Sequence, residues 1–175
     1  MPDLMPFDVI ALRLAHVVAG VAWVGGAFVM ILHVTRTARR RGEDGEAFMT
    51  SLLTDGKAAR YFELAAFTTV AAGALLYWRA SAGLQLGWIT SPSGIGFTIG
   101  AIAAVVSLAW GATLVGPSGK RAAQIQADVA AGGGATTLAQ ATELDAIRRR
   151  LNTFAMVDLI LLGVAVVCMA TARYW

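Results

Sequence analysis

Four long apolar runs limit the fold of this chain more than any motif in it does. A helix needs about 20 residues to cross the ~30 Å of hydrocarbon in a bilayer, and each run is close to that length or longer. In addition, 57% of the residues are hydrophobic and 14% are charged, against about 25% charged in an average soluble domain. We therefore expect an all-α integral membrane protein with a single four-helix transmembrane domain over residues 1–175. The expected helices cover residues 7–34, 62–79, 95–116 and 152–172.

The basic residues predict the orientation of these helices, because Lys and Arg are held on the cytoplasmic side of a membrane. Of the 14 Lys and Arg residues, six lie between the first and second helices and five between the third and fourth. Loops 35–61 and 117–151 are therefore expected in the cytoplasm, with both termini outside. Short connections favour antiparallel neighbours, so we expect an up-down-up-down bundle, multi-pass in the bacterial cytoplasmic (inner) membrane with the lipid bilayer around it. This topology accounts for the net charge of +3, so nucleic acid is not an expected partner.

Several classes of function are disfavoured by what the sequence lacks. A single cysteine, Cys168, excludes an internal disulfide and a Cys-based zinc cluster. No Ser or Cys nucleophile has a nearby His, so a hydrolase is not expected. The first apolar segment is expected to be retained, because Asp3 and Asp8 stand at its start where a secretion signal would carry Lys or Arg.

Both predicted cytoplasmic loops contain apolar residues at helical spacing. In the first loop they predict a short amphipathic helical turn, and in the third a helix after the break at Gly132 to Gly134. Gly96 and Gly100 form a small-xxx-small pair, which predicts close packing of the third helix against a neighbour. The residues that carry the loop pattern are Phe48, Leu52, Leu53, Leu138, Leu144, Ile147 and Leu151.

The first apolar run carries Arg13 and His16, and function is the default explanation for an ionisable side chain at membrane depth. Residues three or four apart share a helix face, so Arg13, His16, Gly20 and Trp23 form one stripe. Such a stripe suits a b-type haem. The imidazole of His16 would ligate the haem iron and Arg13 would pair with a propionate. Gly20 would let the porphyrin edge approach the backbone.

Two other interpretations of this stripe remain open. His16 would instead hydrogen-bond a neighbouring helix while Arg13 extends to the outer headgroups. A metal or transport role is the third. The other histidine, His33, lies seventeen residues further on, about 25 Å along the same helix, so the two histidines cannot both ligate one haem. Met169 of the last helix matches the depth of His16 and is a candidate sixth ligand; without it the haem would be five-coordinate.

A second polar group is expected near the cytoplasmic ends of the helices, formed by His33, Glu63, Asp158 and Arg60. Asp158 lies inside the fourth helix, where a carboxylate without a partner is costly. Arg60 or His33 is its expected partner. These residues indicate either a proton path or cation site, or a clamp, which is a set of hydrogen bonds that holds neighbouring helices together. The clamp is the favoured interpretation.

The run from Ala15 to Phe28, with its His-x6-Trp-x-Gly-Gly spacing, resembles the first-helix signature of a group of four-helix bacterial membrane proteins. The group comprises the copper-resistance D-type proteins, an uncharacterised integral membrane family related to them, and the HemJ-type protoporphyrinogen oxidases. In the HemJ-type branch the resemblance implies that His16 ligates a b-type haem with help from a lysine on the third helix. The corresponding region here, Gly94 to Thr98, contains no lysine, which favours the other two branches. Copper itself is poorly supported, because the chain has no Met-rich cluster.

Two classes of function follow from the sequence. The first is a redox protein in which a haem ligated by His16 serves electron transfer or the oxidation of a membrane-soluble substrate. The second is a non-catalytic structural or accessory subunit of a homo-oligomer or larger membrane complex, with copper or ion transport as a further alternative. No cofactor other than haem is expected.

Overall fold

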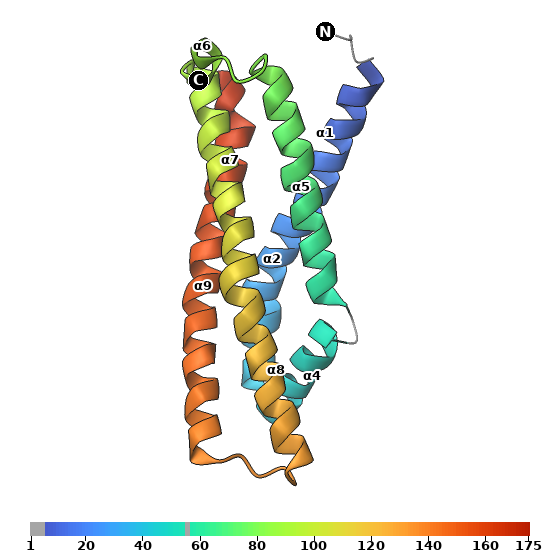
Figure 1. Ribbon diagram of the computed structural model, residues 1–175, viewed down its shortest axis with the longest axis vertical. Helices are drawn as coiled ribbons and strands as arrows, with labels where there is room; N and C mark the ends of the chain where they lie inside the picture. Colours follow the sequence, from blue (N-terminus) through green and yellow to red (C-terminus); the bar gives the residue numbers. More distant parts are fainter. Residues whose placement is uncertain (1–5, 55–56) are drawn as a thin grey trace.

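The computed structural model describes residues 6–54 and 57–175, and every regular element in these residues is helical, as expected for an all-α chain (Figure 1). The first long helix is continuous from α1 (Pro6–Gly20) through α2 (Gly26–Val29) to α3 (Thr35–Arg40). Two π-helical segments, Val21–Gly25 and Met30–Val34, join these parts. The other helices are α4 (Glu43–Thr54), α5 (Ala58–Ala80), α6 (Leu86–Ile89), α7 (Pro92–Trp110), α8 (Gly116–Ala131) and α9 (Leu138–Thr171). A π-helical segment, Gly111–Val115, joins α7 to α8, and a 3-10 turn, Ala172–Tyr174, follows α9.

Among the described residues, three helices are long and apolar enough to cross a membrane: Phe7–Arg40, Pro92–Ala131 and Leu138–Tyr174. They correspond to the first, third and fourth predicted spans and indicate a membrane-embedded protein. The second predicted span is α5, which lies beside them (Figure 1). Arg60 and Glu63 near its start and Arg79 near its end lower its apolar character, which is why its composition alone does not mark it as a span.

The helices extend further than their apolar runs predicted. The first continues six residues past Val34, to Arg40, and α9 begins at Leu138, inside the predicted loop. Thr137 caps α9, since its hydroxyl accepts from the backbone N–H of Gln140 while the Gln140 side chain accepts from the Thr137 N–H. The helices predicted within both loops are confirmed as α4 and the first half of α9. Hydropathy detects the part of a helix that lies in hydrocarbon, and polar caps determine where the helix ends.

Close backbone contact joins α7 to α9, as the Gly96 and Gly100 pair predicted. A Cβ placed on Gly96 would lie 2.9 Å from the Ala172 Cβ and 3.1 Å from its Cα. A Cβ on Gly100 would lie 2.7 Å from Met169 Cγ and 3.2 Å from the Ala165 carbonyl oxygen. Only glycine lets the two helices approach this closely.

A small apolar core connects this pair of helices to the pair formed by α5 and the first long helix. The buried members come from the first helix, α5 and α9, and most of them are alanines. Trp23 is the largest, and Leu162 of α9 is fully buried beside it. Elsewhere many large apolar side chains are exposed, which fits a surface that faces lipid. The core cluster is Trp23, Ala27, Ala65, Ala66 and Leu162.

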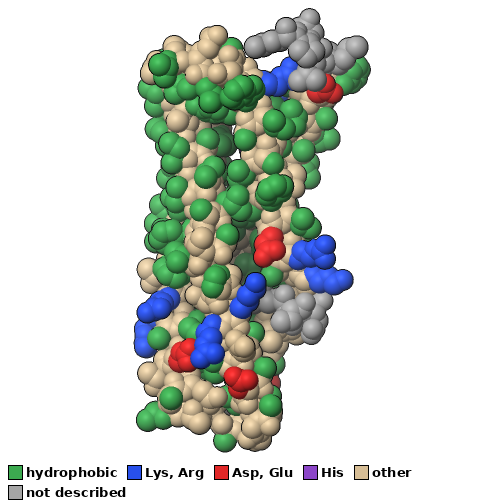
Figure 2. All heavy atoms as spheres, in the orientation of Figure 1, with side chains coloured by type: hydrophobic (Ala, Val, Ile, Leu, Met, Phe, Trp, Pro, Cys, Tyr) green, Lys and Arg blue, Asp and Glu red, His purple; other side chains and the backbone are tan. Residues whose placement is uncertain are grey.

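Charged side chains gather at the end of the molecule formed by α4, α8 and the first half of α9 (Figures 1 and 2). Arg121 of α8 makes a two-pronged ion pair with Glu143 of α9, at 2.7 and 3.0 Å. Arg148 pairs with Glu46 of α4. The start of α1 and the end of α9 lie together at the opposite end (Figure 1). Most charged side chains of the displayed face therefore lie at one end of a long apolar body (Figure 2).

Replacing Gly96 by leucine should separate α7 from α9, because the new side chain would overlap the backbone of Ala172. We expect Gly96→Leu to lower the free energy of unfolding by about 1–3 kcal/mol, measured by denaturant titration in detergent. Gly163→Leu is the matched control, since no heavy atom lies within 4 Å of a Cβ placed there. Equal losses in the two variants would contradict the close α7–α9 contact.

Candidate functional site

His16 of α1 is the residue on which the candidate site depends, and its side chain is directed at α5. Its Nδ1 lies 2.8 Å from the Thr69 carbonyl oxygen. A carbonyl can only accept a hydrogen bond, so Nδ1 carries the proton and donates it. In the neutral ring Nε2 then holds a free lone pair. This is the arrangement in which a metal-ligating histidine is oriented by a bond from its other nitrogen.

Two glycines shape the space around this imidazole. A Cβ on Gly73 of α5 would lie 2.8 Å from His16 Cε1 and 2.9 Å from Nδ1, so the ring packs directly on the α5 backbone. A Cβ on Gly20 would lie 3.5 Å from the Thr69 side chain. Gly20 thus faces Thr69, and Gly73 is the glycine that receives the imidazole.

Arg13 and Trp23, which belong to the same predicted stripe, lie in different environments. Arg13 is exposed one turn outward of His16 and makes no ion pair among the described residues. Trp23 is 6% exposed and belongs to the apolar core beside Leu162. The first helix diverges from the other helices toward its start (Figure 1), so His16 meets α5 whereas Trp23 meets both helix pairs. Trp23 is therefore a core residue, and His16 with Arg13 remains available to a ligand.

Met169, the predicted sixth ligand, lies in the other helix pair. Its Cγ and Cε are the atoms that a Cβ on Gly100 of α7 would meet, at 2.7 and 3.4 Å. Its side chain therefore fills the α7–α9 contact. Within residues 6–54 and 57–175, no group of three or more His, Cys, Asp or Glu side chains is placed to hold a metal ion. In the described part of the chain, Nε2 of His16 is thus a single candidate ligand, and Met169, the predicted second ligand, is not placed beside it.

The partner of Asp158 is Ser107, which corrects the prediction of Arg60 or His33. The Ser107 hydroxyl of α7 donates to Asp158 Oδ1 of α9 at 2.5 Å, and Ser107 is buried. One turn along α7, Trp110 packs edge-on against Phe154, with ring centroids 5.5 Å apart. Trp110 Nε1 is buried and has no hydrogen-bond partner in the described part of the chain. The bond to Asp158 is thus a clamp between α7 and α9.

The other members of the predicted polar group are not brought to Asp158. His33, Arg60 and Glu63 are exposed, and no hydrogen bond or ion pair of theirs is found in the described ranges. Long charged side chains near helix ends reach toward the headgroups, which removes the need for a partner inside the membrane. Their positions along the helices predicted a similar depth in the membrane. They lie on different helix faces, however, and this keeps them apart.

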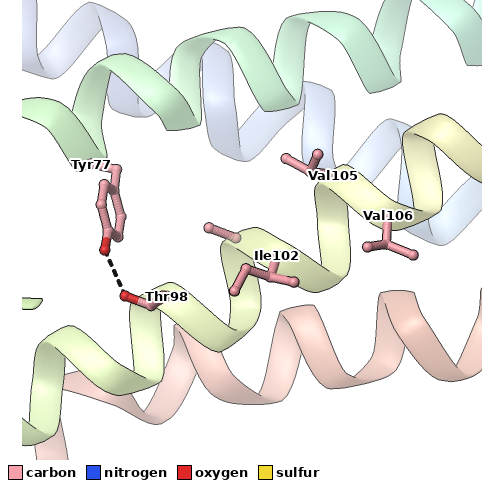
Figure 3. Close-up of a pocket in the computed structure, with 6 residues that line it drawn as sticks. Tyr77, Thr98, Ile102, Val105 and Val106 are labelled. Atoms are coloured by element: carbon pink, nitrogen blue, oxygen red, sulfur yellow. Dashed lines mark hydrogen bonds between the residues drawn. The ribbon is translucent and has the colours of Figure 1, made fainter. Parts of the chain in front are cut away.

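A groove between α5 and α7 was not anticipated from the sequence. Tyr77 of α5 and Thr98 of α7 point toward each other at one end of it, with their hydroxyl oxygens 2.6 Å apart (Figure 3). Apolar side chains of α7 line the rest, and the space has a volume of about 310 Å³. The sequence feature that could have indicated this groove was a tyrosine and a threonine inside two apolar runs. The apolar lining residues are Ala101, Ile102, Val105 and Val106.

Comparison of the chain with known protein families, with curated proteins and with solved structures finds no match. The resemblance to the copper-resistance D-type and HemJ-type proteins therefore stays a prediction that rests on the first-helix motif.

Replacing Ser107 by alanine should destabilise the protein, because the Asp158 carboxyl would lose the donor that it has inside the helix pair. We expect Ser107→Ala to lower the free energy of unfolding by about 1–3 kcal/mol. Adding Asp158→Leu should recover most of this loss, since removing both partners leaves no unpaired polar group. Ser93→Ala on the same helix is the control. A double variant less stable than Ser107→Ala would argue that Asp158 has another partner.

Proposed function

We propose that the chain is an integral protein of the bacterial cytoplasmic membrane that crosses it four times, up-down-up-down, with both termini outside. Three apolar helices of sufficient length support this proposal. As the second span, α5 has 23 residues, about 34 Å, which exceeds the ~30 Å of hydrocarbon. The start of α1 and the end of α9 lie at one end and most charged side chains of the displayed face at the other (Figures 1 and 2), as the positive-inside rule requires.

The topology can be tested with single cysteines introduced into a Cys168→Ala background. Gln85→Cys lies between α5 and α6, and Ala135→Cys lies between α8 and α9. A maleimide that cannot cross membranes should label Gln85→Cys in intact spheroplasts and Ala135→Cys only after permeabilisation. Labelling of both sites in intact spheroplasts would exclude four spans with both termini outside.

We further propose that His16 is the axial ligand of a b-type haem, and that the protein is a membrane redox protein. The observation that carries this proposal is the 2.8 Å bond from His16 Nδ1 to the Thr69 carbonyl, which leaves Nε2 free. An imidazole held in this way by a neighbouring helix binds iron in a fixed orientation. Because Met169 is engaged elsewhere, the haem would be five-coordinate.

The residues near His16 suggest how such a haem would be held. Arg13 is exposed one turn further out, without an ion pair among the described residues, and is placed to meet a propionate at the outer headgroups. A bound haem would supply one-electron redox chemistry, for electron transfer or for the oxidation of a membrane-soluble substrate. The protein would contribute the ligand, its orientation and an apolar surrounding. Copper transport has less support, since the described residues contain no group of three or more His, Cys, Asp or Glu side chains placed to hold a metal ion.

The haem proposal predicts a reduced-minus-oxidised absorbance spectrum of a b-type haem in the protein purified in detergent after expression with adequate haem. His16→Asn should abolish the haem spectrum while the protein stays folded, because the asparagine amide nitrogen stands in the position of Nδ1 and can still donate to the Thr69 carbonyl. His33→Ala should retain the spectrum, since His33 is exposed and about 25 Å from His16 along the helix.

The two histidine variants separate the proposal from its competitor. If His16→Asn and His33→Ala both retain the haem spectrum, another residue is the ligand. If the wild-type protein shows no haem absorbance, the redox proposal fails. His16 is then a clamp between α1 and α5, and a non-catalytic subunit becomes the better interpretation. Co-purification of other chains after mild solubilisation of native membranes would support that outcome.

A further inference from the structure

Two arginine triplets that are far apart in the sequence meet at the end of the molecule where charged side chains gather (Figure 2). Arg39 to Arg41 stand at the end of α3, and Arg148 to Arg150 lie in α9. The Arg39 guanidinium donates to the side-chain oxygen of Asn152, and this bond joins α3 to α9. The two triplets therefore belong to one surface, although more than one hundred residues separate them.

Carboxylates neutralise only part of this surface. Arg148 pairs with Glu46 of α4 and, at 3.7 Å, with Asp145 of its own helix. The partner of Arg39 is an amide oxygen instead. An amide accepts a hydrogen bond but carries no charge, so the positive charge of Arg39 is not compensated by this contact.

Two further arginines lie on the helix faces that this bond joins. Residues three apart share a helix face, so Arg36 lies beside Arg39 on α3. By the same spacing, Arg149 lies beside Asn152 on α9. Both side chains are exposed, and neither has an ion pair or hydrogen bond within residues 6–54 and 57–175. We call Arg36, Arg39 and Arg149 the arginine cluster. It carries three charges that no carboxylate of the described residues neutralises.

The arginine cluster lies where the predicted hydrocarbon meets the cytoplasmic headgroups. Arg36 follows the first predicted span by two residues and Arg149 precedes the fourth by three, which is about 3 and 4.5 Å along the helices. The headgroup layer is about 5–7 Å thick on each side of a bilayer. Toward the membrane, Val29 shares the face of Arg36, and Met156 shares the face of Asn152. Val29 and Met156 are 54% and 48% exposed, so both can contact acyl chains.

From this arrangement we propose that the arginine cluster binds an anionic phospholipid of the cytoplasmic leaflet whose headgroup carries two phosphates. A guanidinium binds a phosphate through two parallel hydrogen bonds, and basic pockets between helices on this side of a membrane bind such headgroups. Three uncompensated charges exceed what one phosphate neutralises, which favours two. An acidic protein segment would meet the same charges, but it would not use the apolar side chains on the membrane side. The inference rests on the proposed membrane placement and is independent of the haem.

Native mass spectrometry of the full chain in detergent tests this site, with cardiolipin as the probe that carries two phosphates. We expect Arg36→Gln combined with Arg149→Gln to weaken cardiolipin binding about 25-fold, roughly fivefold for each charge removed. Neither side chain has a partner to lose in the described ranges, so the variant should keep the fold. Phosphatidylglycerol, with one phosphate, should bind the wild-type protein more weakly than cardiolipin does.

A matched variant separates this site from attraction to net charge. Lys57→Gln combined with Lys120→Gln removes the same charge from exposed positions before α5 and on α8, and it should leave the dissociation constant of cardiolipin nearly unchanged. Equal losses in the two double variants would overturn the site. Equal binding of cardiolipin and phosphatidylglycerol would exclude an occupant with two phosphates.

Two further measurements identify the occupant and protect the inference from the failure of its premise. A polyglutamate peptide that binds the wild-type protein as tightly as cardiolipin would overturn the proposal in favour of a docking surface for an acidic protein. The membrane placement is tested separately by the labelling of Gln85→Cys and Ala135→Cys. Labelling as expected, together with cardiolipin binding that the arginine variant does not change, would refute the lipid site and leave the four-span topology standing.

Discussion

The structure depends on close contacts between helices, although the lipid around them does not drive the helices together. Lipid tails are as apolar as the helix surfaces, so packing and hydrogen bonds must supply the attraction. Gly96 and Gly100 let α9 approach α7, and Gly73 lets the His16 ring rest on α5. The contact at Gly73 also brings His16 within reach of the Thr69 carbonyl on the next helix. The geometry around His16 is thus a consequence of the packing.

Away from the charged end, three hydrogen bonds among the described residues join different pairs of helices. His16 bonds to Thr69 between the first helix and α5, Ser107 to Asp158 between α7 and α9, and Tyr77 to Thr98 between α5 and α7. A polar group without a partner is costly in hydrocarbon, so each bond resists separation of its helices. The first bond differs from the others because its donor is an imidazole with a second nitrogen. That nitrogen is the atom that would bind the iron of the proposed haem.

Much of the fold was predictable from apolar run lengths, and the glycine pair at 96 and 100 correctly indicated a close helix contact. The partner of Asp158 was not predictable, because residue depth along a helix says nothing about the helix faces that meet. A charged partner was expected from the cost of a buried carboxylate, yet a serine on the adjoining helix provides the bond. Likewise His16 was identifiable from its position in an apolar run. Its partner is a backbone carbonyl, which no residue type could indicate.

The same packing logic explains why the groove lies where it does. Tightly joined pairs form along α7 and α9 and along α1 and α5, where glycines remove the side chains that would separate them. Between α5 and α7 the outer halves have no such glycine contact, and Tyr77 with Thr98 bridges them instead. Larger side chains hold two helices further apart than glycine does, and the apolar space between them must be filled in a membrane.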